Sequence, residues 1–448
     1  MSNGKQTEMK TLFNFIFILF TSIVLLSCST TEPPILPVET KPILTLELDD
    51  VSCIEAWLQL KTKDLTLPVE LTLKQFNQTG DSISQIFLLN TKDSLLYIDS
   101  LLPNQSYKFL ITMQKGNNAS NETIVSTMDT TSHDFTFQSW TFGTIGSSVL
   151  YDVAIINEND IWAVGEIMIA DTSQNGYTIY NAVHWDGSQW QLLRIPNYDY
   201  PNTLIYGALQ TIYAFSENDI WFCSYSNLVH FDGNSFLSKA QFMTSINFDG
   251  QVIKMWGSDK KNIYCVGRNG AIYHYYGTSW QRIESGTNNN IGDISGIQNE
   301  DGKYIKYCAA DNFLIRIDDD DNLANIIVEQ GTFFNSVWAA SNRLIYTAGN
   351  GILLYRNESW QFFNVPEINT IYRIKGQSYN DIVGLSANLS IFHFNGYTWN
   401  SIQTGTNNIY LKVQIKNNII ATTGWNGNRA IITILFRNYD SLTGNIQK

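Results

Sequence analysis

The chain has 448 residues, of which 44% are hydrophobic, 13% aromatic and 15% charged, and its net charge is −13. An acidic chain lacks the basic face that nucleic-acid binding needs, so we expect no nucleic-acid partner and no electrostatic docking to anionic lipid. The length allows two or three domains, and the many Tyr, Phe and Trp residues favour strands. Few stretches repeat apolar residues at helical spacing, so the sequence predicts an all-β protein.

The N-terminus has the layout of an export signal. From Met9, one lysine precedes an apolar run from Leu12 to Leu26. The run is short for a membrane span, so we interpret residues 1–27 as a signal peptide whose start is Met1 or Met9. A core helix or a transmembrane anchor is the alternative interpretation of this run.

The end of this run, LLSC, resembles the bacterial lipobox, in which a small residue precedes a lipidated cysteine. The resemblance implies that Cys28 becomes the first mature residue and carries acyl chains. We therefore expect a lipoprotein of the bacterial cell envelope, anchored to a membrane (with the outer membrane as the expected location) and facing either side of it. Residues 28–42 are rich in Pro, Thr and Glu, which predicts an extended tether.

Residues 43–133 contain short alternating runs separated by turn-rich stretches, the pattern of a β-sandwich. The stretch LLPNQSYKFLI, with Leu102, Pro103, Tyr107 and Phe109, resembles the fibronectin type III family, as does Trp57 on the second strand. The resemblance implies that Tyr107 is a tyrosine-corner residue, whose hydroxyl bonds the backbone upstream. Such domains in exported bacterial proteins are commonly spacers, so we predict a spacer, with direct ligand binding as the alternative.

Residues 134–448 contain two recurring motifs, and the equivalent turns of the second motif follow one another at intervals of about 39 to 46 residues. One motif is NDIWAVG at 159–165, which returns as NDIWFCS at 218–224, and the other is VHWDGSQW at 183–190, which returns as VHFDGNSF at 229–236. Asp-Gly pairs suit tight hairpins, and four short strands per unit are typical of a propeller blade. The number of turns predicts seven blades.

The seventh blade lacks a fourth strand of its own. The segment QSWTFGTIG at 138–146 is similar to two fourth strands, TSWQRIESG and YTWNSIQTG, so we expect Ser139–Phe142 to complete the seventh blade and close the ring. The repeats resemble sialidase-like and photosystem-assembly-factor-like propellers. DGSQW is similar to the Asp-box of sialidases, although it is one residue shorter and lacks the serine. This resemblance covers about 310 residues and is specific only for architecture.

Side chains that suggest chemistry mostly fall on repeat positions. Four histidines share one third-strand position in different blades, so they cannot converge on one metal: His184, His230, His274 and His393. His133 lies in the interdomain linker. Three aspartates occupy the turn between first and second strands, where we expect bonds to local backbone: Asp160, Asp219 and Asp381. Five fourth-strand tryptophans are expected to pack between blades: Trp140, Trp190, Trp280, Trp360 and Trp399.

The remaining chemical motifs are weak. Four cysteines have neither disulfide nor metal spacing and are interpreted as small buried residues: Cys53, Cys223, Cys265 and Cys308. The acidic run Asp318–Asp321 favours a solvated hairpin turn, with a calcium site as the alternative. Nucleotide fingerprints, a nucleophile elbow and a sialidase arginine cluster are absent from the sequence. We therefore predict no catalytic residue, no metal and no cofactor.

The irregular loops on one face of the predicted disc are the expected ligand surface. They carry aromatic residues that we expect to be exposed, beside arginines, and both residue types are frequent in binding hot spots and suit stacking on sugars. The candidate binding residues are Tyr198, Tyr200, Arg268, Phe334, Trp425 and Arg429. The sequence thus favours a monomeric, non-catalytic lipoprotein that binds or scaffolds a protein or glycan. A glycan-active hydrolase or lyase, with its site at the mouth of the propeller channel, is the alternative.

Overall fold

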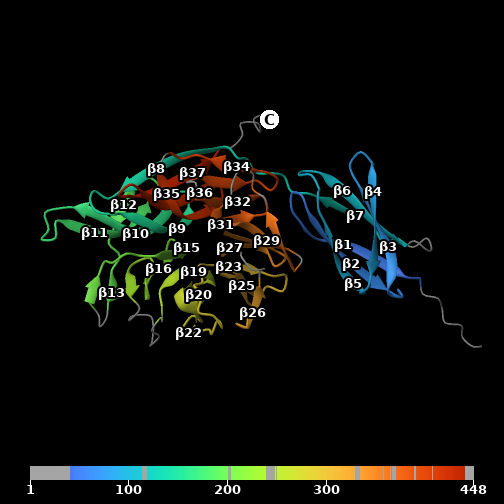
Figure 1. Ribbon diagram of the computed structural model, residues 1–448, viewed down its shortest axis with the longest axis horizontal. Helices are drawn as coiled ribbons and strands as arrows, with labels where there is room; N and C mark the ends of the chain where they lie inside the picture. The colour runs from blue at the N-terminus through green and yellow to red at the C-terminus, as the bar shows by residue number, and fades with distance from the viewer. Residues whose placement is uncertain are drawn as a thin grey trace, which may run out of the picture.

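The computed structural model describes residues 41–113, 119–199, 203–238, 248, 250–327, 333–356, 358–363, 365, 370–387, 390–405 and 407–438. In these residues the chain is built from strands, with one short 3₁₀ turn, η1 (Arg268–Gly270). The strands form a small sandwich followed by a large disc (Figure 1). The expectation of an all-β chain is confirmed. The signal peptide, Cys28 and most of the tether lie outside the described residues.

The sandwich consists of two antiparallel sheets. One sheet has the order β1 (Ile43–Val51), β2 (Ala56–Lys63), β5 (Asp93–Ile98), and the other has the order β4 (Ser82–Leu89), β3 (Val69–Phe76), β6 (Ser106–Met113), β7 (Thr123–Ser126). Alternate residues such as Leu58 and Phe109 fill the core between the sheets. The Tyr107 hydroxyl accepts a hydrogen bond from the Leu102 backbone N–H at 2.9 Å, the upstream backbone bond expected of this tyrosine.

The disc consists of seven four-stranded antiparallel sheets in the described part of the chain, six with their strands in sequence order and the seventh with β8 as its outer strand. The first three blades are β9 (Val149–Asn157), β10 (Asp160–Ala170), β11 (Tyr177–Trp185), β12 (Trp190–Leu193); β15 (Thr211–Ser216), β16 (Asp219–Ser224), β17 (Asn227–Phe231), β18 (Phe236–Ser238); and β19 (Val252–Asp259), β20 (Asn262–Gly267), β21 (Ile272–Tyr275), β22 (Trp280–Arg282). The hairpin β13 (Asn197–Asp199) and β14 (Thr203–Ile205) lies between the first two.

Four further blades complete the ring of a seven-bladed propeller. They are β23 (Asp293–Gln298), β24 (Tyr304–Ala310), β25 (Phe313–Ile317), β26 (Leu323–Ile327); β27 (Phe334–Ser341), β28 (Leu344–Gly349), β29 (Gly351–Arg356), β30 (Ser359–Phe363); β31 (Ile371–Ser378), β32 (Asp381–Ser386), β33 (Ile391–Phe394), β34 (Trp399–Ile402); and β35 (Asn408–Lys416), β36 (Ile419–Asn426), β37 (Arg429–Arg437) with β8 (Phe135–Phe142). The first strand of each blade lies beside the first strands of its neighbours, which places these strands around the axis.

The ring is closed by a strand from the other end of the disc's chain. β8 pairs antiparallel with β37 along its whole length, with Trp140 opposite Ile432, and the two strands lie side by side in Figure 1. The predicted closure is therefore confirmed, and it covers the edge that β37 would otherwise expose. Trp140 packs against Trp185 and Trp190 of the first blade, with ring centroids 5.7 Å apart in both pairs.

The sandwich packs directly on the fifth and sixth blades. Trp57 points away from the sandwich core and is fully buried among Tyr97 and propeller residues that include Trp338 and Tyr379. Its place on the second strand agrees with the expected pattern, but its side chain belongs to the interface between sandwich and propeller. A buried tryptophan of this size makes the two parts pack as one unit, which a freely hinged spacer would not do.

Ion pairs surround this apolar contact. The Arg356 guanidinium lies 2.7 Å from the Glu55 carboxylate and also donates to the Tyr97 hydroxyl, and Arg343 pairs with Asp49. The four cysteines in the described residues are buried and form no disulfide with one another, as expected for small core residues.

Candidate functional site

In the first two blades, each repeated histidine is bound to the turn aspartate of its own blade. His184 Nε2 lies 2.9 Å from Asp160 Oδ1, and the Trp162 indole N–H donates to the same oxygen while its ring stacks on His184 at 4.1 Å. The second blade repeats this arrangement: His230 lies 2.8 Å from Asp219, and Trp221 stacks on His230. We call each such set an outer clamp.

The outer clamps correct the expected partners of the turn aspartates and support a structural role for the repeated histidines. The turn aspartates were expected to bond local backbone, whereas the Oδ1 atoms of Asp160 and Asp219 each bind an indole from the same strand and an imidazole from the next strand of the blade. Asp186, in the hairpin that follows His184, does bond local backbone, because it accepts from the N–H groups of Ser188 and Gln189. The histidines are therefore structural parts of their blades.

Two blades modify the clamp. In the third blade, His274 binds Asn262 at 2.7 Å with one nitrogen and Asp321 of the next blade at 2.7 Å with the other, and Tyr264 also donates to Asp321. Burial would raise the pKa of Asp321, but these hydrogen bonds lower it to about 2. One residue of the acidic run thus joins two blades, and in the described residues no cluster of three or more His, Cys, Asp or Glu could hold a metal ion.

In the sixth blade, the clamp of His393 and Asp381 extends to the linker. His133 Nδ1 lies 2.8 Å from His393 Nδ1, and Arg437 donates to Asp381 at 2.5 Å. Burial and the neighbouring His393 and Arg437 lower the pKa of His133 to about 4. Because a protonated His133 is disfavoured here, the linker depends on a neutral imidazole.

The loop-face candidates do not form one cluster. Tyr200 lies outside the described residues, and Tyr198 is placed only through its backbone, which pairs with Leu204 in the β13–β14 hairpin. Arg268 is exposed in η1, at the connection between the second and third strands of its blade. The described positions of Tyr198 and Arg268 thus come from separate loops.

The other three candidates take part in packing. Phe334 is only 1% exposed and lies 5.8 Å from the Trp360 ring, so the expectation that it is exposed is wrong. Phe334 packs inward because it is the first residue of β27, the innermost strand of its blade. Arg429 is exposed but donates to the carbonyls of Thr141 and Gly143, which fastens the closing strand, and Trp425 is half-buried in β36.

A more concentrated polar site lies around the axis. In every blade, one residue of the first strand pairs with the second-strand residue just before a glycine, serine or alanine. We call these seven residues the axial ring: Asp152, Thr211, Lys254, Asp293, Ser336, Arg373 and Lys412. The position is the same in each blade, but its residue type differs, unlike the repeated residues of the outer clamps.

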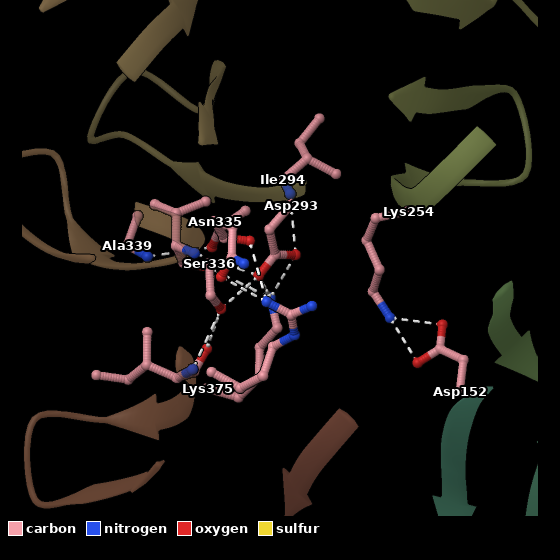
Figure 2. Close-up of polar contacts among 12 residues, drawn as sticks. Asp152, Lys254, Asp293, Ile294, Asn335, Ser336, Ala339 and Lys375 are labelled. Carbon is pink, nitrogen blue, oxygen red and sulfur yellow. Dashed lines mark hydrogen bonds and ion pairs between the residues drawn. The ribbon is translucent and has the colours of Figure 1, made fainter. Parts of the chain in front are cut away.

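The two aspartates of the ring bind their neighbours in the same way. Asp152 accepts from the Thr211 hydroxyl of the next blade at 2.8 Å and from Lys254, two blades away, at 2.9 and 2.7 Å. Asp293 likewise accepts from the Ser336 hydroxyl at 2.7 Å and from Lys375, two blades away, at 2.9 Å to each oxygen. Figure 2 shows both carboxylates with their lysines.

The lysines keep both carboxylates ionised. Burial alone would raise the pKa of Asp293, but Lys375, Lys412 and Lys254 outweigh it and lower the pKa to about 2. The same balance of burial against Lys254 and Lys412 lowers the pKa of Asp152. Neither carboxyl group can therefore act as a proton donor near neutral pH.

Arg373 and Lys412 are held differently. Arg373 donates through Nε to the Leu411 carbonyl at 3.2 Å and through Nη1 to Asn335 Oδ1 at 2.6 Å. Lys412 is half-buried, and among the described residues no hydrogen bond or ion pair reaches its ammonium group. Burial and the charges of Arg373 and Lys254 lower the pKa of Lys412 to about 7. The arrangement can attract a negative group and has no neutral acid for bond cleavage.

The sequence held a signal for this ring that motif searching missed. Asp160 lies eight positions after Asp152, and the same spacing leads from Thr211 to Asp219, from Lys254 to Asn262 and from Arg373 to Asp381. Comparing that position across the repeats would have found Lys254 and Arg373, whereas Asp293 and Lys412 lie in blades with a different spacing. Lys375 would still have been missed, because its pairing with Asp293 depends on contact between non-adjacent blades.

No helix among the described residues is both long and apolar enough to cross a membrane.

No protein-family model matches the chain. No curated protein matches it either. Solved structures do match. The structure described as "YCF48 bound to D1 peptide" has a TM-score of 0.51 and 12% identity, and it covers 68% of this chain and 97% of its own. "Structure of U3-55K" has a TM-score of 0.49, 8% identity and coverage of 66% and 98%, and "Crystal structure of RRP9 WD40 repeats" has 0.46, 6%, 66% and 97%. By its seven sheets and its likeness in fold to the first of these structures, the chain is a β-propeller protein.

Proposed function

We propose that this chain is a non-catalytic binding protein that presents the loop face of its propeller to a protein partner. The observation that carries the proposal is the axial ring, where one structural position carries seven side chains of differing chemistry near that face. A fold alone does not require such variety, whereas recognition of an asymmetric partner does. A propeller of similar fold whose structure is described with a bound peptide is consistent with this use of the fold.

Glycan hydrolysis or cleavage has less support. Glycoside hydrolysis needs one carboxyl group that stays protonated to donate to the leaving oxygen, beside a second that stays ionised. Asp152 and Asp293 are each bound by a lysine that lowers the carboxyl pKa. The repeated histidines are committed to the outer clamps. The proposed ligand is accordingly a protein, and a glycan is the second candidate because exposed loop arginines suit both.

Site-specific photo-crosslinking on the full chain tests the proposed face. A photoreactive residue would replace Arg268, exposed at the loop-face end of β20, or Lys261, exposed at the opposite end of the same strand. We expect protein adducts from position 268 and few from position 261. Adducts from 261 alone, or none from either in the native envelope, would refute the proposed face. Glycan binding by the full chain without protein adducts would favour the second candidate.

We further propose that the chain is a lipoprotein, anchored through Cys28 in the bacterial envelope, and that its N-terminal sandwich is fibronectin type III-like. The LLSC sequence supports the lipid anchor. The strand order of the sandwich and the hydrogen bond to the Tyr107 hydroxyl support the fibronectin type III-like assignment. Mass spectrometry of the purified N-terminus should find acyl chains on Cys28, and Cys28→Ser should release the protein from the membrane. An unmodified, membrane-bound Cys28→Ser protein would contradict the anchor.

A further inference from the structure

The axial ring and the neighbouring Lys375 together carry more positive than negative charge. Two carboxylates, Asp152 and Asp293, face four cationic side chains: Lys254, Arg373, Lys375 and Lys412. In an overall acidic chain, this leaves two positive charges in excess at the axis when all four cations are protonated. Buried charge without a counterion is unfavourable, so such an excess needs a reason.

The carboxylates are already used by particular partners. Lys254 takes both oxygens of Asp152, and Lys375 takes both oxygens of Asp293. Hydroxyl and backbone N–H groups from the next blade complete the coordination of both aspartates. The charge of Lys412 therefore has only longer-range attraction to these aspartates, which are already neutralised.

Two donors remain on adjacent strands. Lys412 Nζ and Arg373 Nη2 have no hydrogen-bond partner among the described residues, and neither is one of the fully buried unpaired atoms. Arg373 reaches the strand of Lys412, because its Nε donates to the carbonyl of Leu411, the residue before Lys412. The two charges are near enough for Arg373 to lower the pKa of Lys412. An ammonium and one edge of a guanidinium thus lie on adjacent first strands, and both side chains are half-buried.

We propose that Lys412 and Arg373 form a binding site for a small oxyanion, such as a phosphate or a carboxylate, at the propeller axis. An oxyanion would accept hydrogen bonds from both donors at once. Such hydrogen bonds between charged groups are stronger than hydrogen bonds between neutral groups. Its negative charge would also offset the positive charge that Asp152 and Asp293 do not balance. The lowered pKa of Lys412 agrees with this account, since a bound anion would restore the charged lysine.

This inference deepens the proposed function, because a partner's carboxylate could occupy the same site. Titration calorimetry on the full chain would use inorganic phosphate, acetate, and a short peptide with either a free or an amidated C-terminus. Preference for phosphate would indicate a free phosphate ligand. Binding of the free-acid peptide and not of its amide would indicate a partner's carboxylate. Failure of all these probes would overturn the proposal.

The residue assignment needs matched variants. Lys412→Met should weaken binding of the probe by roughly tenfold to a hundredfold, the loss expected for one charge-assisted hydrogen bond. Lys412→Arg should largely restore it. Lys416→Met, at the exposed end of the same strand, should leave it unchanged. Equal binding by wild type and Lys412→Met, with both folded by circular dichroism, would overturn the site.

A direct readout of Lys412 is available by NMR. In protein with labelled lysine side chains, the Lys412 signal should titrate near neutral pH, and saturating phosphate should raise its pKa. A titration that does not respond to phosphate or acetate contradicts the proposal. If the anion binds but cross-linking from position 268 fails, the anion site stands and the proposed protein-binding function fails.

Discussion

The outer clamps and the axial ring are both buried polar networks, but they are built in opposite ways. A clamp repeats nearly the same residues in several blades, as His184 with Asp160 and His230 with Asp219 show, and in these two blades the partners lie within the blade. The ring places different residues at one position, and Asp152 and Asp293 reach two blades away. Residues that repeat from blade to blade therefore indicate a structural role within the blade. A position whose residue type differs between blades indicates a single site that belongs to the whole disc.

The strongest way to break the ring is to remove a carboxylate. Asp293→Asn should lower the free energy of unfolding by about 3 to 5 kcal/mol, because it leaves Lys375 buried without its counterion. Asp152→Asn should cost a similar amount, since its contacts have the same pattern. Urea denaturation of the full chain measures both. A loss below about 1 kcal/mol in either variant would contradict the buried ion pairs.

The opposite effect is expected at Lys412. Lys412→Met should raise the free energy of unfolding at pH 7 by about 1 to 3 kcal/mol in buffer without phosphate, because an unpaired buried charge is replaced by an apolar chain. Its folded pKa of about 7 lies below the 10.5 of an ordinary lysine, so the unfolded chain binds more protons between these values. Wild-type stability should therefore rise with pH across this window, and the variant should lose that slope. Lys416→Met serves as the exposed control.

The clamps should respond less than the ring. Asp219→Ala removes the acceptor of both His230 and Trp221 and should cost about 1 to 2 kcal/mol. Asp219→Asn should cost clearly less, because the third blade already uses Asn262 to bind its histidine. Thermal unfolding of the two variants tests this order. An asparagine variant as unstable as the alanine variant would mean that the clamp depends on charge.

The smallest effect concerns the linker clamp. The folded pKa of His133, about 4, lies below the ordinary 6.5, so the unfolded chain binds more protons between these values. Stability should fall as pH decreases through this window, by about 1 kcal/mol once solvent screening of a half-buried group is considered. His393, Arg437, Asp381 and Thr398 surround the ring. His133→Gln should remove part of the acid sensitivity, and an unchanged pH profile would contradict this role.

Much of the fold could be predicted because propeller blades repeat locally. The fourth strand around Trp140 was identified from its similarity to two other fourth strands, and its pairing with β37 followed from the need to complete the last blade. The side chains that face another blade or domain were less accessible to sequence reasoning. Trp57 sits on the expected strand but faces the propeller, and Phe334 is buried although its loop was expected to be exposed.

The candidate site was harder to predict for the same physical reason. Aromatic and arginine residues in loops suggest binding by composition, but composition does not say whether a side chain packs inward or fastens a neighbour, as Arg429 does. The axial ring is defined by register and by contacts between blades that are far apart in sequence. A lysine such as Lys412 is unremarkable in the sequence until burial and its charged neighbours lower its pKa.

The closing strand has a mechanical consequence. β8 follows directly after the linker, so tension applied to the chain before Ile43 would load the one strand whose loss opens the ring. The sandwich interface provides a second load path, because Trp57 and the Arg356–Glu55 pair transmit force to the fifth and sixth blades. Under such tension, the interface between the sandwich and the propeller should therefore separate before β8 detaches from β37 and the ring opens.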